Sequence, residues 1–376
     1  MNIDTHLILI SAQAVPNITP ILDEQYRPRK VIMLVSADMR QRADWLESVI
    51  RSRVGNITRW PVENAWDIEH IRDQVVDLLA VHHENIALNA TGGTKPMSIA
   101  AYEVFREFDK PIFYVHPEYD RIIWMHPADQ PGGNLADRLK LPEFLKAFGA
   151  EVTAQGDKYG VPRRFRELTK TLILNAETYT EPLRVLNAYA AKAKPALTVA
   201  LDPKHQNYRQ LENLIGLFQD HRLLELKSGQ LIFPSEETRF YINGGWLEQH
   251  VWGICLNLKK TLVLQDVGRG IEVERNHRKP PIRNEMDIAL LKDNRLYIIE
   301  CKTHHDKNPV NNKNTQALYK LDSLKDLLGG LQARAMLVSY NPPNKYDLQR
   351  AHDLGIAICA HRSLAHLSQK LTEWIR

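Results

Sequence analysis

The chain has 376 residues, of which 44% are hydrophobic and 25% charged, and its formal net charge is +4. This composition is typical of a folded protein of two or three domains, excludes extensive disorder and permits a nucleic-acid partner. The three cysteines, Cys255, Cys301 and Cys359, lack CxxC spacing, which argues against a disulfide framework or a structural zinc site. No apolar run approaches the roughly 20 residues of a membrane span, and the start lacks a signal-peptide pattern. We therefore expect a cytoplasmic protein with no membrane partner.

Short apolar runs alternate with amphipathic stretches from Leu7 to about Met125. This alternation indicates βα units around a parallel sheet, and therefore a doubly wound, Rossmann-like α/β fold. Strands are expected at residues 7–10, 31–35, 57–60, 86–88 and 112–115, with a helix over residues 65–81. Small polar residues follow the first, second and fourth of these strands. Ligands of open α/β sheets bind beyond the carboxyl ends of the strands, so these three loops predict one binding crevice.

The loop after the fourth strand is rich in glycine and polar residues, with the sequence Asn89-Ala90-Thr91-Gly92-Gly93-Thr94-Lys95-Pro96. A tight glycine turn that leads into a helix presents main-chain N–H groups, which bind anions together with the helix dipole. Thr91, Thr94 and Lys95 add hydroxyl donors and a positive charge. The spacing matches neither GxxxxGK[ST] nor GxGxxG. A phosphate-bearing ligand is therefore predicted, with a plain βα turn as the alternative.

Proline and glycine accumulate between residues 126 and 157, which indicates a domain edge. An amphipathic run from Tyr208 is followed by two short strands around Ser228-Gly229, a pattern that favours a small winged-helix-like connector. From Gly244 onward the pattern is that of a separate α/β domain. We predict three domains, at residues 1–145, 146–240 and 241–376.

Two acidic residues of the C-terminal segment lie on neighbouring strands of an expected hairpin. Asp287 belongs to the strand 286–291, and Glu300 and Lys302 lie two residues apart on one face of the strand 296–302. Metal-assisted phosphodiester hydrolysis needs carboxylates to bind a hard divalent cation and a basic group to orient water. Asp287 and Glu300 are the predicted metal ligands, with the carbonyl of Cys301 completing the set. Lys302 is predicted to position the water or to stabilise the transition state.

The tripeptide [DE]xK by itself is weak evidence, because Asp202-Pro203-Lys204 and Glu225-Leu226-Lys227 also fit it. Neither of these two tripeptides follows an acid on an adjacent strand, so Glu300 and Lys302 are the better candidates for an active site. An exposed, salt-bridged strand end is the alternative for the favoured set. Glu248, at the start of an expected helix, is predicted as an outer catalytic residue.

Several polar residues near this constellation have weaker claims to a role. Glu285, on the face of Asp287, fits a substitute ligand or a solvated charge. His304 and His305 fit loop histidines better than ligands. For the remaining polar residues two interpretations stay open, namely contact with substrate phosphates and a solvated surface position. They are Gln316, Tyr319 and Lys320 on the next helix and the basic run Arg275, His277, Arg278, Lys279 and Arg283.

The Asn89–Lys95 turn and the set Glu248, Asp287, Glu300-x-Lys302 together resemble the CARF (CRISPR-associated Rossmann fold) effector nucleases of type III CRISPR defence. The resemblance covers nearly the whole chain. It implies an N-terminal CARF domain that binds a cyclic oligoadenylate across a homodimer axis and a C-terminal PD-(D/E)xK, restriction-endonuclease-like domain. Cyclic tetra-adenylate would fit this symmetry. Residues implied as ligand contacts are Ser11, Gln13, Asn17, Ser36, Thr91, Gly92, Gly93, Thr94 and Lys95.

The resemblance further implies a metal-dependent endonuclease that uses Mn²⁺ or Mg²⁺. Its expected substrate is single-stranded DNA or RNA, with nicking of duplex DNA as a further activity. The sequence departs from the motif's name before Asp287, where Glu285-Met286 stands in place of proline. Gln316 and Tyr319 are also closer than the Q-x-x-x-Y of some relatives, which puts their role in doubt.

Two other functions compete with the gated nuclease. One is a cyclic-nucleotide-sensing, DNA-binding regulator without nuclease activity, against which the intact Asp, Glu and Lys set argues. The other is an N-terminal domain that degrades its own activator. The Thr91 turn offers no general base for that reaction.

Overall fold

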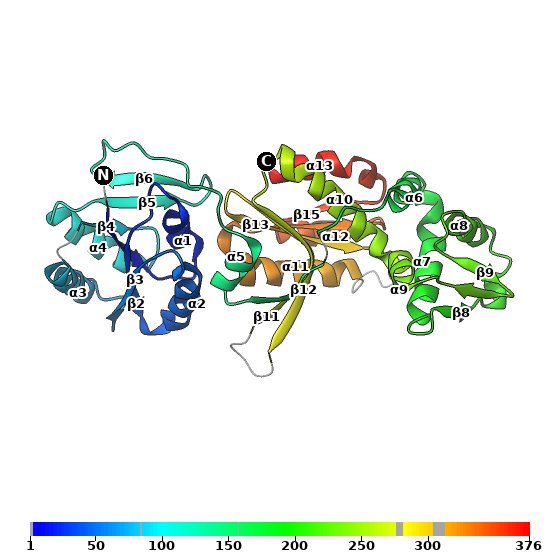
Figure 1. Ribbon diagram of the computed structural model, residues 1–376, viewed down its shortest axis with the longest axis horizontal. Coiled ribbons are helices and arrows are strands. Elements are labelled where there is room, and N and C mark those ends of the chain that lie inside the picture. Colours follow the sequence, from blue (N-terminus) through cyan, green and yellow to red (C-terminus); the bar gives the residue numbers. More distant parts are fainter. Residues whose placement is uncertain (1–2, 83–84, 157, 276–280, 304–312) are drawn as a thin grey trace.

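The computed structural model describes residues 3–82, 85–156, 158–275, 281–303 and 313–376. Three bodies lie in a row, namely the N-terminal sheet with its helices, the C-terminal sheet with its helices, and a mainly helical connector (Figure 1). The connector follows the N-terminal body in the chain but lies at the far end of the molecule. None of the helices in the described ranges is long and apolar enough to cross a membrane.

The N-terminal body is built on a six-stranded sheet. In spatial order its strands are β3 (Asn56–Val62), β2 (Lys30–Ser36), β1 (Thr5–Leu9), β4 (Ile86–Asn89), β5 (Ile112–His116) and β6 (Arg121–His126). The first five are parallel, which confirms the strands predicted from the apolar runs. Strand β6 is an antiparallel edge strand that the sequence analysis did not predict, although Ile122 to Met125 form an apolar run.

Helices cover both faces of this sheet. They are α1 (Val15–Leu22), η1 (Ala37–Met39), α2 (Arg40–Ile50), α3 (Ile68–Val81) and α4 (Lys95–Glu107), while α5 (Leu141–Ala147) packs against α2. Alternate residues of β1 pack on opposite sides, because Ile8 joins the core under α1, α2 and α5 while Leu7 and Leu9 join the core under α3 and α4. The predicted doubly wound arrangement is confirmed. Strands β1 and β4, which lead into two of the predicted ligand loops, are neighbours at the centre of the sheet.

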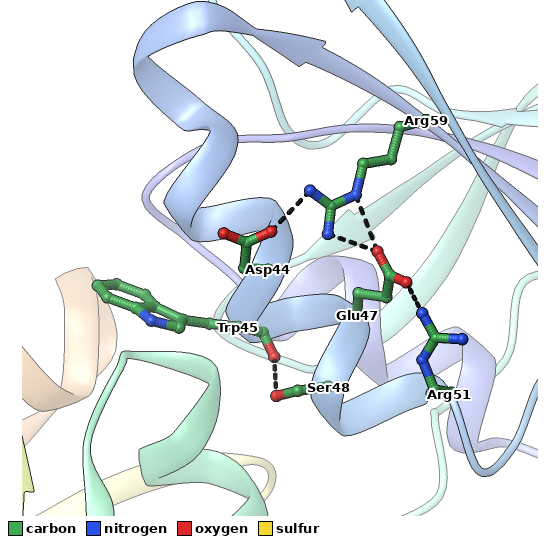
Figure 2. Close-up of polar contacts among 6 residues, drawn as sticks. All are labelled: Asp44, Trp45, Glu47, Ser48, Arg51 and Arg59. Carbon is green, nitrogen blue, oxygen red and sulfur yellow. Dashed lines mark hydrogen bonds and ion pairs between the residues drawn. The ribbon is translucent and has the colours of Figure 1, made fainter. Parts of the chain in front are cut away.

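An ion-pair cluster ties α2 to the edge strand β3 (Figure 2). The guanidinium of Arg59 lies 2.6 Å from Asp44 and 2.5 Å from Glu47, and Glu47 also pairs with Arg51. Trp45 points away from this cluster, and a Cβ on Gly149 would lie only 2.3 Å from its ring. The cluster lies at the surface, where such pairs orient elements more than they stabilise them.

The C-terminal body contains a second six-stranded sheet. In spatial order its strands are β15 (Ile356–Ala360), β14 (Arg334–Ser339), β13 (Arg295–Lys302), β12 (Ile282–Lys292), β11 (Asp266–Arg275) and β7 (Glu151–Ala154). Strands β11 to β13 are antiparallel and β13 to β15 parallel. The predicted hairpin is confirmed, with its turn at Asp293-Asn294, where both residues have positive φ. Strand β7 comes from the segment that the sequence assigns to the connector.

Helices pack on both faces of this sheet as well. They are α10 (Trp246–Thr261), α11 (Lys313–Gly329), η4 (Gly330–Gln332), α12 (Lys345–Asp353), η5 (His361–His366) and α13 (Leu367–Ile375). Helices α10 and α13 share one core with Ile299 and Cys301, and α11 shares the other with Ile298. The core under α11 is continuous with the core under α1, α2 and α5 of the N-terminal body. Apolar packing therefore links the two bodies.

A polar contact adds to this joint. Asp120, in the turn between β5 and β6, accepts a hydrogen bond from Asn294 in the turn between β12 and β13. Burial raises the pKa of Asp120 to about 7, and the Asn294 hydrogen bond opposes this shift. The two hairpin turns thus meet through a buried carboxyl group.

The connector has helices around a small antiparallel sheet of order β8-β10-β9. Its elements are α6 (Arg163–Leu174), α7 (Ala176–Lys192), β8 (Thr198–Ala200), η2 (Pro203–His205), α8 (Arg209–Asp220), β9 (Glu225–Lys227), β10 (Gln230–Ile232), α9 (Glu236–Phe240) and the π-helical turn η3 (Tyr241–Gly245). The predicted order of helix, strand, turn and strand is confirmed. Its winged-helix character and the domain limits at residues 145 and 240 stay predictions.

Candidate functional site

The two predicted metal-binding carboxylates lie at the same end of the β12–β13 hairpin. Ile288 pairs with Ile299, and Asp287 and Glu300 each stand one residue beyond this pair, on opposite strands. Both side chains are buried, with 8% of Asp287 and 1% of Glu300 exposed. Buried carboxylates this close need compensating charge or hydrogen bonds, because burial penalises their ionised forms.

Main-chain hydrogen bonding orients the first carboxylate. The Cys301 N–H donates to Oδ2 of Asp287 over 2.7 Å. Burial raises the pKa of Asp287 to about 6 and the charge of Glu300 adds to the shift, whereas Lys302, this N–H group and Lys320 oppose it. The Cys301 side chain lies in the apolar core on the opposite side of the sheet. The residue therefore serves the site through its backbone.

Two lysines converge on the second carboxylate. Nζ of Lys302 lies 2.5 Å from Oε1 of Glu300, and Nζ of Lys320 lies 2.9 Å from Oε1 and 2.7 Å from Oε2. Burial disfavours the charged form of Lys302, but Glu300 and Asp287 outweigh this and raise the pKa of Lys302. Lys302 comes from the same strand as Glu300, and Lys320 comes from α11. The contact with Lys320 was not predicted from the sequence.

Glu248 approaches the hairpin from the first turn of α10. Helix α10 follows the π-helical turn η3, in which Gly244 has φ +109°. A Cβ on Gly244 would lie 2.1 Å from Oγ1 of Thr303, so glycine permits this close approach to the end of β13. Burial raises the pKa of Glu248 to about 8, with Asp287 as the next contributor and Lys302 opposing. The charges of Asp287, Glu300 and Lys302 all act on the pKa of Glu248, so the four predicted catalytic residues lie near one another.

The donor set suits a hard divalent cation. Asp287 and Glu300 offer carboxylate oxygens and Cys301 a carbonyl oxygen, the ligand types that Mg²⁺ and Mn²⁺ prefer. Within the described ranges, no group of three or more His, Cys, Asp or Glu side chains is arranged to hold a metal ion. A cation here would therefore depend on the two carboxylates, the carbonyl and water. Asp287 and Glu300 repel each other, and in this structure Lys302 and Lys320 supply the positive charge that balances them. A divalent cation bound by the two carboxylates would supply the same balance.

Several of the weaker candidates are exposed or pair with other residues. Gln316 and Tyr319 are exposed on α11, and the guanidinium of Arg350 lies 5.2 Å from the Tyr319 ring. Glu285 is exposed, and Arg283 pairs with Glu274 at 3.0 Å. Arg275 is buried. His277, Arg278, Lys279, His304 and His305 lie outside the described residues.

The glycine turn of the N-terminal body packs tightly against the end of β1. A Cβ on Gly92 would lie 2.1 Å from the Leu9 carbonyl oxygen, and Gly93 has φ +74°. Neither position accommodates a larger side chain without displacement or strain. The side chain of Lys95 is exposed at the start of α4. The turn therefore packs its main chain closely against β1 and exposes one lysine at the carboxyl edge of the sheet.

The threonine hydroxyls of this turn bind to the protein itself. Thr91 Oγ1 donates to Oδ1 of Asn89 over 2.6 Å and accepts from the Val115 N–H. Thr94 Oγ1 donates to the Ala65 carbonyl over 2.7 Å and caps α4 by accepting from the Met97 N–H. In this arrangement the two threonines shape the turn. Asn89, which the sequence analysis did not assign to the site, anchors Thr91. The sequence feature that could have revealed this role is a polar residue at the end of a buried strand.

The other predicted ligand residues divide into buried supports and residues of the exposed loop. Asn17 is buried and donates to the Leu9 carbonyl over 2.9 Å, and Ser36 is buried and donates to Asp38 over 2.6 Å. Ser11 accepts from the Gln13 N–H at the start of the loop after β1. Oε1 of Gln13 accepts from the Leu331 N–H over 3.2 Å. Gln13 therefore connects the predicted ligand loop to the C-terminal body.

Family models match both ends of the chain. Residues 5–144 match the model described as Card1 CARF domain, and residues 235–376 match the model described as Card1-like, endonuclease domain. A search of curated proteins found no match.

Two of the matching solved structures cover 99% of this chain. Protein VC1899 from Vibrio cholerae is 31% identical, with a TM-score of 0.90 over 99% of this chain and 97% of that chain. Can2 from Sulfobacillus thermosulfidooxidans, solved in complex with cyclic tetra-adenylate, is 26% identical, with a TM-score of 0.84 over 99% of each chain. A type III CRISPR defence DNA nuclease activated by cyclic oligoadenylate is 18% identical, with a TM-score of 0.51 over 90% of this chain and 45% of that chain. This last likeness concerns the fold alone.

Proposed function

We propose a function on the premise that this chain belongs to the Card1-like family, in which a CARF domain and an endonuclease domain share one polypeptide. The protein is a nuclease of type III CRISPR defence that a cyclic oligoadenylate activates. The observation that carries this conclusion is the buried pair Asp287 and Glu300, with Lys302 bound to Glu300, in one chain with the glycine turn of the CARF domain.

The endonuclease site is of the PD-(D/E)xK type and depends on a divalent metal. Asp287, Glu300 and the Cys301 carbonyl would hold Mn²⁺ or Mg²⁺, which would polarise the scissile phosphate and lower the pKa of a bound water. The Cys301 N–H fixes the Asp287 carboxylate for this task. Lys302 orients the attacking water or stabilises negative charge on the phosphate. Glu248 lies beyond this set as an outer acidic group.

The activator is cyclic tetra-adenylate, bound across the axis of a homodimer. The cyclic tetra-adenylate complex of Can2, whose fold extends over the whole of this chain, supports this choice. A ring with two-fold symmetry places equivalent phosphates before two copies of the Gly92-Gly93 turn. Main-chain N–H groups, the start of α4 and Lys95 favour an anion there. Ser11, Gln13, Asn17, Ser36, Thr91 and Thr94 complete or support the crevice.

The substrate is nucleic acid, with single-stranded DNA and RNA as the first candidates. The test is cleavage of labelled single-stranded DNA, single-stranded RNA and supercoiled plasmid with Mn²⁺, with and without cyclic tetra-adenylate. We expect the wild type to cut at least one of these only with both additions, and chelation to stop the reaction. Glu300→Ala should not cut.

A matched control is available in the connector. Glu225-Leu226-Lys227 has the same E-x-K pattern on a short strand, so Glu225→Ala should cut like the wild type. Absence of cutting by a wild type that binds the activator would contradict the nuclease and favour the DNA-binding regulator.

A further inference from the structure

Helix α11 supplies a second cation to the endonuclease site. Nζ of Lys320 contacts both oxygens of Glu300, at 2.9 and 2.7 Å, while Lys302 contacts Oε1 alone. Glu300 is almost completely buried, so its oxygens have little access to solvent. Its carboxylate is therefore bound on both oxygens by lysine ammonium groups.

In this arrangement Lys320 contacts the Glu300 oxygens that a metal ion would need as ligands. A metal that binds Glu300 must take at least one of the oxygens that Lys320 contacts. A divalent cation close to an ammonium group is also repelled by it, and the repulsion is stronger in a buried site than in water. Lys302 is on the same strand as Glu300, whereas Lys320 is on a separate helix. Movement of α11 can thus withdraw Lys320 without disturbing Lys302.

The C-terminal end of the same helix meets the predicted ligand loop. Helix α11 ends at Gly329 and leads into η4, where the Leu331 N–H donates to Oε1 of Gln13 over 3.2 Å. Gly330 has φ +62°, and a Cβ there would lie 2.4 Å from that same oxygen. A residue without a side chain therefore lets Gln13 reach η4.

Helix α11 is suited to transmit a displacement between these two points. It is a continuous helix of 17 residues, and Leu318, Leu321, Leu324 and Leu328 bury one of its faces. That apolar face belongs to the core that continues under α1 and α2. Packed helices move as units, because their interiors are close-packed.

We propose that Lys320 is a positioning residue that competes with the metal for Glu300, and that Gln13 holds α11 in this competing arrangement until the CARF domain binds its ligand. The proposal rests on the proposed function, since it describes how the same site is regulated. Ligand binding would draw Gln13 away from Leu331, release the end of α11 and withdraw Lys320 from Glu300. Glu300 would then bind metal through the freed oxygen.

The first test measures Mn²⁺ affinity of the full-length protein without nucleic acid, by calorimetry and by the electron paramagnetic resonance of free Mn²⁺. Lys320→Gln should bind Mn²⁺ tighter than the wild type by about fivefold or more, the lower end of typical coupling between sites. Cyclic tetra-adenylate should tighten Mn²⁺ binding by the wild type and have little effect on Lys320→Gln. Lys325→Gln is the control, because this α11 lysine contacts Asp322 and the Leu354 carbonyl instead.

The second test addresses the link to the ligand loop. Gly330→Ala should push Gln13 away from η4 and tighten Mn²⁺ binding in the absence of activator. In the double variant with Lys320→Gln this gain should disappear, since both changes act on one contact. Thermal melting of each variant checks that it folds.

These outcomes separate the proposal from the proposed function. Unchanged or weaker Mn²⁺ affinity in Lys320→Gln overturns the competition, and additive effects of the two substitutions overturn the link through Gln13. A wild type that binds Mn²⁺ but cuts no nucleic acid would contradict the nuclease and leave the affinity comparison decisive for Lys320.

Discussion

The CARF turn and the endonuclease site use polar residues in opposite ways. At the turn, the hydroxyls of Thr91 and Thr94 bind protein groups, and the side chain of Lys95 is exposed. At the hairpin, Asp287 and Glu300 are buried, and two lysines balance them. Close main-chain packing shapes the first of these, and balanced side-chain charge the second. Substitutions should therefore have different consequences at the two sites.

The largest effect is expected from removing a charge at the hairpin. Glu300→Gln keeps the shape of the side chain and removes the negative charge that Lys302 and Lys320 balance. We expect activator-dependent cleavage to fall by about 100-fold or more, a typical loss when an electrostatic group is removed from an active site. Initial cleavage rates, compared with those of Glu225→Gln, measure the effect. A cleavage rate within about twofold of the wild-type rate would show that Glu300 is not required.

At the CARF turn the comparison predicts that added volume, with no change of charge, is damaging. In Gly92→Ala the new Cβ would meet the Leu9 carbonyl, and the turn must shift. We expect the free energy of unfolding to fall by about 1 to 3 kcal/mol and activator affinity to drop. Gly216→Ala is the control, because a Cβ there meets nothing within 4 Å and lies inside α8. It should be neutral or slightly stabilising. Equal behaviour of the two variants would refute the close-packing argument.

A smaller, pH-dependent effect is expected at the joint between the two bodies. The pKa of Asp120 is raised to about 7 in the folded protein, above its ordinary value of 3.8, chiefly by burial. The folded state therefore holds this proton through a range where the unfolded state has lost it. Stability from this group is complete at low pH and is lost as the pH rises through about 7.

Asp120→Asn removes this dependence. At pH 8 we expect the variant to unfold at a higher temperature than the wild type, with a gain of roughly 1 to 2 kcal/mol, and near pH 4 the difference should vanish. Melting curves across this range provide the measurement, with the exposed Asp129→Asn as the control. A gain that does not change with pH would contradict the assigned cause.

The smallest effect is expected at the surface cluster of Figure 2. Arg59 bridges Asp44 and Glu47, of which Asp44 is exposed, whereas the two lysines of the hairpin site pair with the buried Glu300. Arg59→Met should lower the free energy of unfolding by less than about 1 kcal/mol, and high salt should reduce the difference. Denaturant titration at two salt concentrations measures both. A loss as large as that of Gly92→Ala would mean that exposed charge matters as much as packing.

Much of the fold was predictable because its strands carry local signals. Apolar runs marked β1 to β5, and acids on adjacent runs marked the β12–β13 hairpin. The sequence analysis did not predict that β7 joins the edge of a sheet formed by residues beyond 266. Local periodicity identifies strands, but their partners depend on tertiary packing across long stretches of chain.

The site was predictable to the extent that its residues follow one another along an element. Asp287, Glu300 and Lys302 belong to one hairpin, so period-two geometry places them together. For Lys320 the sequence analysis left substrate phosphate contact and a solvated surface open, because nothing local shows which face of α11 meets Glu300. The Gln13–Leu331 contact joins residues 318 positions apart, and no sequence pattern indicates it.

The most direct test of the account measures binding and cutting on the same preparations. Affinity for labelled cyclic tetra-adenylate and Mn²⁺-dependent cleavage of single-stranded DNA and RNA are determined for the wild type, Glu300→Ala and Gly92→Ala. We predict that Glu300→Ala binds the activator like the wild type and does not cut, whereas Gly92→Ala loses both properties together. A wild type that cuts equally well without the activator, or a Glu300→Ala variant that cuts like the wild type, would contradict the account.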